Sequence, residues 1–476
     1  MSVLKTFFKD TVIYGLAIVL PRLINFLLVR LHTDVLPNEG YSENTEFYVV
    51  AAFFNVILTY GMETSFFRFF SKNKDKKAVL STAILTILGS TLLFGIALLV
   101  FRETISEILR INTDFYTLLV GITLIDTLIV IPFAYLRVTG RPIRFASIKL
   151  INVLIIVVLN VLLLSKTYGW EGLREWFHVE NKVEYIFIAN LIASAAVLIL
   201  VSPYFFRSKF QFDTKILKQL LTYGWPIMVA GLAFVINENL DKWLLPSLES
   251  EFVNGAYSAC YKLAVFMTLF IQAFRMGAEP FFFNHSDKDN ATQTYATILK
   301  YFTIVGALGL MIVVIYIDLL RPLFINKESY LLALDIVPIV LLANLCLGIY
   351  HNLSIWYKLT DRTKFGMYIS IIGAGITIAV NLIFIRKIGF MAAAYATLMA
   401  YGIMMLLSYF LGRKYYPVPY QVSRIALYLL LSAGLSFITY YKFDRDILLG
   451  TVFLLLFSAL VVFLERKELT KLLRKG

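Results

Sequence analysis

A series of apolar blocks, each near twenty residues long, constrains what this chain can fold into more than any other feature. About twenty apolar residues are needed to cross a hydrocarbon layer roughly 30 Å thick as a helix. Charged residues make up 16% of the chain, whereas soluble domains carry about 25%. We place the blocks at residues 12–31, 46–70, 78–101, 116–136, 150–165, 185–206, 220–240, 257–283, 301–317, 336–357, 366–385, 388–411, 425–441 and 447–464. The sequence therefore predicts an all-α integral membrane protein with about fourteen transmembrane helices and excludes a soluble enzyme.

The segments between the blocks are too short to hold a separate catalytic domain. The longest polar connections cover residues 32–45, 166–184 and 284–300, and fewer than about 40 residues rarely fold alone. Cys260 and Cys346 both lie inside apolar blocks, so they support neither a disulfide framework nor a metal cluster. The sequence contains no nucleotide-binding loop or metal-ligand spacing. We therefore expect a protein that is not an enzyme and that holds no metal or other cofactor.

The net charge of +13 is unevenly distributed between alternate connections. Basic residues gather on one set of connections, at Lys72, Lys74, Lys76, Lys77, Arg137, Arg141 and Arg144, and in the C-terminal tail. Acidic residues gather on the other set, at Asp34, Glu39, Glu43, Glu171, Glu175, Glu180 and Glu184. This is the positive-inside pattern, and it predicts that both termini lie in the cytoplasm. The basic charge therefore indicates orientation and contact with anionic lipid headgroups, and not nucleic-acid binding.

Short motifs recur at a nearly constant offset and indicate an internal repeat. The pattern Gly-x-Glu-x-x-Phe-Phe occurs at residues 61–67 and again at 277–283, and the same offset of 216 aligns Tyr41-Ser42 with Tyr257-Ser258. Lys9 followed by Tyr14-Gly15 matches Lys218 followed by Tyr223-Gly224 at an offset of 209. A duplicated unit of six spans predicts two six-helix bundles, residues 1–206 and 207–411, related by a pseudo-two-fold axis along the membrane normal. Residues 412–476 then form two extra helices and a basic tail, and we expect a water-accessible cavity between the bundles.

Two further stretches carry a resemblance to a known family. They are Gly61-x-Glu63 with Arg68-Phe69, and Asn239-Leu240-Asp241-Lys242 followed by Gly255-Ala256-Tyr257 and Lys262. With the six-plus-six-plus-two arrangement, the chain resembles the polysaccharide-transporter branch of the multidrug/oligosaccharidyl-lipid/polysaccharide exporter superfamily, and more closely its O-antigen-type flippases.

The resemblance implies a function in bacterial surface-polysaccharide synthesis. A protein of this kind moves an undecaprenyl-diphosphate-linked oligosaccharide from the inner to the outer leaflet of the cytoplasmic membrane by alternating access. The implied partners are the lipid-linked oligosaccharide, membrane lipids and the polysaccharide polymerase machinery. The implied driving force is a proton or sodium gradient.

Basic residues inside the blocks are the candidates for binding a diphosphate. An ionisable group at the bilayer centre is costly and points to a cavity or a partner. Arg22 lies near the middle of the first block with Asn25 one turn further on, Arg30 lies near its outer end, and Lys262 lies inside the eighth block. We predict that these four line a cationic substrate cavity, since guanidinium and ammonium groups suit phosphate. The alternatives are a salt bridge for Arg22 and snorkelling to the interface for Arg30.

Acidic residues inside the blocks are the candidates for coupling or gating. Asp126 lies near the centre of the fourth block. Burial there disfavours its charged form, so Asp126 can carry a coupling proton. The alternatives are that Asp126 binds a sodium ion or forms a pair with Arg22. Glu238 and Asp241 share one helical face and predict an outer gate. Glu63 occupies the repeat position matched by Glu279, which predicts a structural or inner-gate role. Arg68 joins the gating set, with snorkelling as its alternative.

Three other functions stay open from the sequence. Within the superfamily they are a lipid II flippase for peptidoglycan precursors and a cation-coupled multidrug exporter. A membrane-embedded polysaccharide polymerase or ligase is the alternative of a different class. We expect such an enzyme to carry a large, basic periplasmic loop, whereas the loops expected outside are short and acidic.

Overall fold

The computed structural model describes residues 20, 21, 23–165, 167–177, 179–207, 211–286, 288–360 and 362–473. These residues form helices joined by short connections, and the described part of the chain contains no strand. The helices fall into two compact units, residues 1–259 and 260–476. The boundary at 206/207, expected from the repeat, stays a prediction.

The helices confirm an all-α membrane protein that crosses the bilayer many times. Among the described residues, twelve helices are long and apolar enough to span a membrane, and a pair bent by 44° makes a thirteenth if it counts as one span. These thirteen correspond in order to the apolar blocks from 46–70 onward. Residues 12–19 and 22 of the first block, 12–31, lie outside the described residues, and residues 20, 21 and 23–35 are helical.

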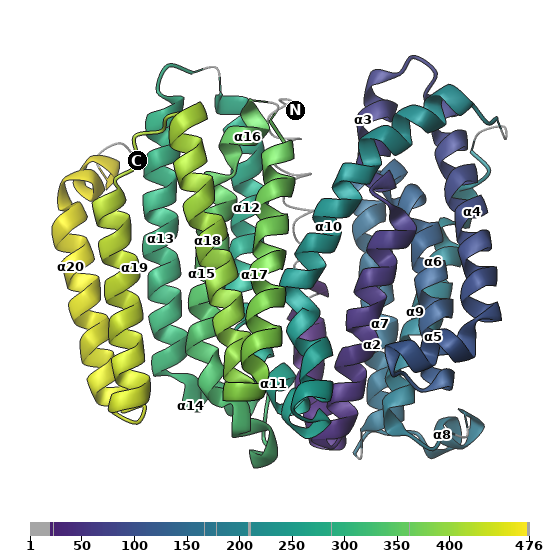
Figure 1. Ribbon diagram of the computed structural model, residues 1–476, viewed down its shortest axis with the longest axis horizontal. Coiled ribbons are helices and arrows are strands. Elements are labelled where there is room, and N and C mark those ends of the chain that lie inside the picture. Colours follow the sequence, from purple (N-terminus) through teal and green to yellow (C-terminus); the bar gives the residue numbers. More distant parts are fainter. Residues whose placement is uncertain are drawn as a thin grey trace. The chain divides into compact units, whose positions relative to one another are not determined.

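The described part of the first unit contains the helix that ends at residue 35 and nine further α-helices, and it shares a tenth with the second unit (Figure 1). Their bounds are α2 (Asn38–Thr59), α3 (Met62–Lys72), α4 (Lys76–Val100), α5 (Arg102–Leu109), α6 (Thr113–Val138), α7 (Pro142–Leu164), α8 (Glu171–Phe177), α9 (Lys182–Val201), α10 (Thr214–Leu248) and α11 (Glu251–Leu263). The last of these, α11, carries the chain across the boundary between the units.

Four helices of the first unit begin at an aspartate or asparagine. The side chains of Asp75, Asn112, Asn181 and Asp213 accept hydrogen bonds from backbone N–H groups in the first turns of α4, α6, α9 and α10. These caps satisfy donors that a helix leaves unpaired at its start. The polar residues between the apolar blocks therefore fix where each helix begins.

The block at 46–70 is not one continuous helix. Tyr60 and Gly61 both have positive φ, 37° and 72°, and they separate α2 from α3. A Cβ atom on Gly61 would lie 2.4 Å from the carbonyl oxygen of Gly224 in α10. Both the positive φ and the close approach of α10 require glycine at position 61. The glycines that the repeat motifs singled out, Gly61 and Gly224, thus meet each other.

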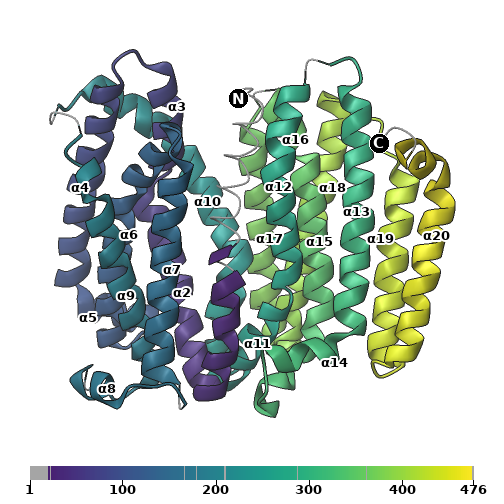
Figure 2. The same ribbon diagram turned by 180° about the vertical axis from the view of Figure 1, so that it is seen from behind.

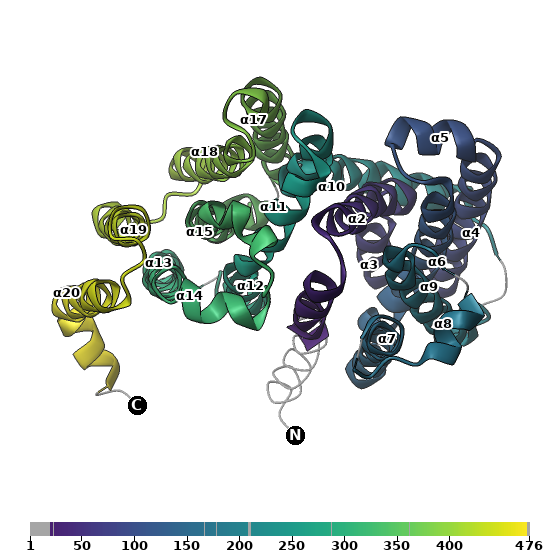
Figure 3. The ribbon, with the colours of Figure 1, turned by 90° about the horizontal axis from the view of Figure 1, so that it is seen from below.

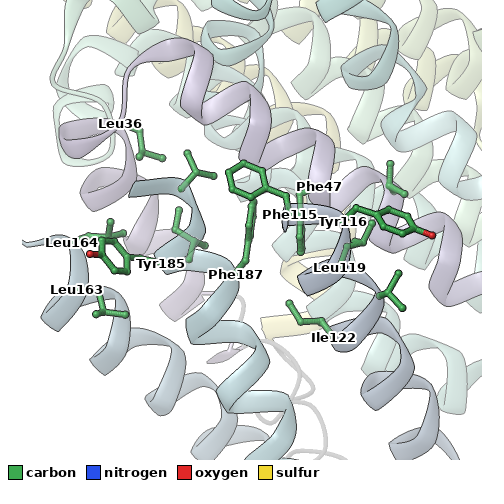
Figure 4. Close-up of a cluster of buried hydrophobic side chains, with 14 residues drawn as sticks. Leu36, Phe47, Phe115, Tyr116, Leu119, Ile122, Leu163, Leu164, Tyr185 and Phe187 are labelled. Atoms are coloured by element: carbon green, nitrogen blue, oxygen red, sulfur yellow. The ribbon is translucent and has the colours of Figure 1, made fainter. Parts of the chain in front are cut away.

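An aromatic cluster forms the core of the first unit where α2, α6 and α9 meet (Figure 4). The rings of Phe47 and Phe187 stack with their centroids 3.6 Å apart, and Phe115 packs edge-on against Phe187 at 5.1 Å. Tyr116, Leu119 and many neighbouring aliphatic residues surround these rings. Burying large apolar side chains between helices fixes the positions of α6 and α9 relative to α2.

Charged residues of the first unit gather at its two ends, as the alternating connections predict. One end holds the end of α3 and the starts of α4, α7 and α10, and we call it the basic end. There the backbone N–H groups of Gln211 and Asp213 donate to Ser81 and Thr82. The other end, where α2 and α9 begin, is the acidic end, and there Asn181 donates to Glu43. Figure 2 shows α6, α7 and α9 running between these ends.

The second unit is built around α15 (Val337–Leu353), in which fifteen of the seventeen residues are buried. Helix α15 packs against α13 and α18, and α18 packs against α17. The bounds are α12 (Val265–His285), α13 (Ala291–Ile315), α14 (Ile317–Leu320), α15 (Val337–Leu353), α16 (Ile355–Leu359), α17 (Lys364–Ile388), α18 (Met391–Tyr415), α19 (Val422–Phe437) and α20 (Ile447–Leu473). Figure 3 shows α19 and α20 beside α13.

A buried ionic network joins these last two helices to α13. The Lys300 ammonium lies 2.5 Å from the Glu465 carboxylate, and both side chains are at most 1% exposed. Glu465 also accepts hydrogen bonds from Arg424 and Tyr428 of α19, each at 2.7 Å. Lys300 makes a second ion pair with Glu468. Burial and multiple bonds make this network a fixed attachment of the two C-terminal helices.

Candidate functional site

A polar cavity of about 370 Å³ lies inside the first unit, between α2, α3, α6, α7 and α9. Polar side chains make up more than half of its lining. They are Asn55, Glu63, Asp126, Arg137, Lys149, Asn152, Asn190 and Ser194. Charged and amide groups of this kind are costly inside a membrane protein, where they usually face water, a partner or a substrate.

Asp126 lies close to the middle of α6 and lines this cavity. Its carboxylate accepts a hydrogen bond of 2.7 Å from the Ser194 hydroxyl of α9. Lys149 of α7 lines the same cavity and attracts the carboxylate electrostatically. The predicted position of Asp126 inside the membrane-spanning region therefore coincides with a cavity that a proton or a small cation could enter.

Lys149 was not among the residues predicted from the sequence. Its ammonium group lies 4.4 Å from the centre of the Phe133 ring, an arrangement that stabilises a cation away from water. The apolar block was drawn from residue 150, directly after this lysine, whereas α7 begins at Pro142. Extending the helix back to Pro142, a residue that suits a helix start, would have placed Lys149 inside it.

Glu63 and Arg137 form an ion pair of 2.8 Å between α3 and α6. Both side chains are almost half exposed, 45% and 41%, and both line the cavity near the basic end. The Arg137 guanidinium also lies 4.9 Å from the centre of the Phe67 ring. A pair with this much exposure can open and reform, so its position suits the inner-gate role expected for Glu63.

The aromatic cluster lies on the opposite side of Asp126 along the helices. Phe115, Leu119 and Ile122 of α6 belong to this cluster, and Asp126 follows one turn after Ile122. On α9, Phe187 belongs to the cluster and Asn190 and Ser194 line the cavity. Buried aromatic and aliphatic side chains therefore separate the cavity from the acidic end of the unit.

A second polar cluster lies at the acidic end, where α10 is followed by α11. Asp241 is only 2% exposed, and its carboxylate accepts a hydrogen bond of 2.5 Å from the Tyr257 hydroxyl. Lys242 lies 3.2 Å from the same carboxylate and donates to the backbone carbonyl of Glu238 at 2.7 Å. The structure thus brings Glu238 and Asp241 together through Lys242. Tyr257 and Lys242 belong to the motifs of the resemblance.

Matching segments of the repeat contact each other at this end. Asn254 donates a hydrogen bond of 2.7 Å to Ser42, and Asn38 donates one of 3.4 Å to the carbonyl of Phe252. A Cβ atom on Gly255 would lie 1.9 Å from the Asn38 carbonyl oxygen. Asn38 and Asn254 are themselves separated by the repeat offset of 216, an equivalence that sequence reasoning missed. Extending the alignment three residues before Tyr41 and Tyr257 would have found it.

The structure does not bring the four predicted cationic-cavity residues together in one described site. Arg22 lies outside the described residues, so its pairing with Asp126 stays a prediction. Asn25 and Arg30 are exposed, and Arg30 lies 3.8 Å from Asp34. Lys262 is exposed on α11. Arg68 is exposed on α3, with its guanidinium 4.4 Å from the centre of the Tyr223 ring.

Comparison with known sequences identifies two related families. Residues 7–286 match the polysaccharide biosynthesis protein family, and residues 226–383 match the MatE family. A curated relative, Lsg locus putative protein 1 of Haemophilus influenzae, is 25% identical over 283 residues. That alignment covers 58% of this chain and 66% of the relative, slightly less than two thirds of its length.

Solved structures of transporters share the fold. The lipid II flippase MurJ in an inward closed conformation matches with a TM-score of 0.70 and 18% identity, over 96% of this chain and all of MurJ. An inward-facing multidrug resistance MATE family transporter of the MOP superfamily matches with a TM-score of 0.65 and 12% identity, over 86% of this chain and 95% of the transporter. Since the first family match covers more than half of the sequence, the chain belongs to the polysaccharide biosynthesis protein family, and it has the fold of MOP-superfamily transporters.

Proposed function

We propose that the protein is a secondary-active flippase that moves a polyprenyl-diphosphate-linked oligosaccharide across the membrane for surface-polysaccharide synthesis. The observation that carries this proposal is the match of residues 7–286 to the polysaccharide biosynthesis protein family. The transporter fold supports movement of a substrate and not its chemical conversion. The similarity to a lipid II flippase supports a substrate with a lipid tail.

Ion coupling is assigned to the cavity around Asp126. A carboxylate that accepts a hydrogen bond from Ser194 and shares a cavity with Lys149 and three asparagines can exchange a proton or hold a small cation. Lys149 provides a second positive charge that competes for the carboxylate. Binding of the coupling ion would then weaken the attraction between Asp126 and Lys149 and alter how α6 and α7 pack.

Gating is assigned to the contact at the acidic end. Hydrogen bonds of Asn38, Ser42 and Asn254 join the start of α2 to α11, and α11 continues into the second unit. A change in these few polar contacts is the kind of two-state element that alternating access requires. Glu63 and Arg137 are the corresponding candidates at the basic end.

Orientation and partners follow from the same proposal. The basic end of the first unit faces the cytoplasm and both termini are cytoplasmic, because basic loops are retained on that side. The membrane is the bacterial cytoplasmic membrane, where the polymerase machinery receives the flipped oligosaccharide. Arg22, Arg30 and Lys262, with the polar Asn25, stay the candidates for contact with the substrate's diphosphate.

Deletion of the gene in its own bacterium tests the substrate class. We expect loss of surface polysaccharide and accumulation of its lipid-linked precursor at the inner leaflet, both restored by the wild-type gene. Normal surface polysaccharide in the deletion strain would refute the proposal. Depletion of cross-linked peptidoglycan would instead favour a lipid II flippase, the candidate suggested by the fold of MurJ. Increased drug susceptibility alone would favour an exporter like the MATE relative.

A further inference from the structure

A basic groove of about 780 Å³ lies between α3 and α10 at the basic end of the first unit. Among the described residues, four cations and no acidic residue line it: the lining residues are Arg68, Phe69, Lys72, Lys215, Lys218, Gln219, Thr222 and Tyr223. Figures 1 and 2 show the start of α10 beside α3. This groove is separate from the cavity around Asp126, since the two share no lining residue.

The spacing of the four cations along their helices places them along the same groove. Arg68 and Lys72 are four residues apart on α3, and Lys215 and Lys218 are three residues apart on α10. Residues at these spacings lie on one face of a helix. Gln219 and Thr222 continue the α10 face with neutral hydrogen-bonding groups. Two helices therefore present positive charge and donors toward a common groove.

No carboxylate neutralises this charge within the described part of the chain. None of the four cations forms an ion pair there, and the Arg68 guanidinium stacks on the Tyr223 ring instead. The nearest aspartate along α10, Asp213, accepts hydrogen bonds from the backbone N–H groups of Lys215 and Ile216 as a helix cap. Like charges held close together without counter-charge repel each other, so an anionic ligand would stabilise the groove.

The surface next to the groove identifies its depth in the membrane. Along α10, Lys215 and Lys218 are followed by Leu221 and Trp225, whose side chains are exposed although both are apolar. Trp225 is 55% exposed, and exposed tryptophans in membrane proteins concentrate at the interface with the headgroups. The groove therefore lies where polar surface gives way to lipid-facing surface, at the level of the phosphates.

We propose that the groove binds the phosphate of a lipid headgroup in the leaflet at the basic end. Arg68 offers a planar pair of donors and the lysines offer compact charges, the combination suited to phosphate oxygens. The ligand has two sources, a bulk anionic phospholipid or the polyprenyl diphosphate of the proposed substrate. Only binding of the polyprenyl diphosphate rests on the proposed function. In that case the groove would be the first position at which the substrate binds before it enters the transporter.

Binding of defined lipids to the purified full-length protein tests this proposal. Native mass spectrometry would measure the affinity for phosphatidylglycerol, for undecaprenyl diphosphate and for uncharged undecaprenol. We expect the double variant K215Q/K218Q to bind the phosphate-bearing lipids about thirty-fold more weakly than wild type, through loss of two basic residues that each attract anionic lipid. Tighter binding of undecaprenyl diphosphate than of phosphatidylglycerol identifies the substrate, and the reverse order identifies bulk lipid.

Two matched variants make the result specific. K74Q/K77Q removes the same charge from exposed positions at the same end but outside the groove, and we expect wild-type affinity. K215R/K218R keeps the charge and should bind like wild type. Equal affinities of K215Q/K218Q and K74Q/K77Q would overturn the proposal. The assay measures binding without transport, so a protein that binds phosphate lipids but flips no oligosaccharide would refute the proposed function and leave the groove in place.

Discussion

Breaking the buried network between α13, α19 and α20 should destabilise the protein strongly. Lys300 and Glu465 pair at 2.5 Å with side chains that are 1% and 0% exposed. Removing one partner of a buried pair costs about 3–5 kcal/mol, because the other charge is left buried. In Lys300→Met, Glu465 keeps Arg424 and Tyr428, so we expect a loss of about 3 kcal/mol in the free energy of unfolding, at the lower end of that range.

Glu465→Met removes the acceptor shared by three donors. Of its two described ion pairs, Lys300 then keeps the one with Glu468, whose side chain is 39% exposed, and we expect a loss of about 5 kcal/mol. The double variant replaces both charges by apolar side chains of similar length. Its loss should be far smaller than the sum of the single losses, since an apolar pair restores a packed core without buried charge.

Unfolding in mixed micelles, followed by circular dichroism, gives the four free energies of this double-mutant cycle. We expect an interaction energy of about 3 kcal/mol or more between the two positions. Lys387→Met, the same substitution at an exposed position of α17, should change stability by about 0.5 kcal/mol at most. Additive losses in the double variant would show that the two side chains do not act as a buried pair.

Three further substitutions test other parts of the account. Gly255→Ala should abolish transport and reduce the folded yield, because the added Cβ would lie 1.9 Å from the Asn38 carbonyl oxygen. In the control Gly402→Ala the added Cβ has open space around it, so transport and folded yield should not change. Equal yields of these two variants would contradict the close approach of α2 and α11. Asp126→Asn should remove the dependence of transport on the ion gradient while the protein elutes as a folded species, and gradient-driven transport equal to wild type would exclude Asp126 from coupling. Glu63→Gln should change the unfolding free energy by about 1 kcal/mol or less, since its pair with Arg137 is almost half exposed, and a larger loss would show that the pair is a fixed structural bond.

Hydrophobicity predicted the helices well because length and apolar content alone decide which segments can span a bilayer. The predicted apolar blocks did not include three charged residues that contribute to the structure. The predicted blocks begin at 150 and 301 and end at 464, so Lys149, Lys300 and Glu465 lie just outside them. The helices continue past these charges, to Pro142 in α7, Ala291 in α13 and Leu473 in α20. A charge at the edge of an apolar block can be buried by a neighbouring helix, which no single-segment pattern reveals.

The repeat motifs predicted the positions of special residues but not their contacts. Gly61 and Tyr257 were found by their spacing, yet their roles come from neighbours far away in the sequence. Gly61 meets Gly224 of α10, and Tyr257 donates to Asp241. The break at Tyr60 and Gly61 was also missed, because hydrophobicity is the same on both sides of it. Contacts of this kind depend on how helices pack, and sequence alone shows only which residues are available for them.

We propose that this chain carries a lipid-linked oligosaccharide across a bilayer. The most direct test of this claim is a vesicle assay with the purified full-length protein and a fluorescent undecaprenyl-diphosphate-linked oligosaccharide, whose exposed fraction is measured with a membrane-impermeant glycosidase. We predict that protein-containing vesicles transfer the oligosaccharide between leaflets at a rate that responds to an imposed proton or sodium gradient, whereas empty vesicles do not. A rate equal to that of empty vesicles, with correctly folded and inserted protein, would contradict the claim.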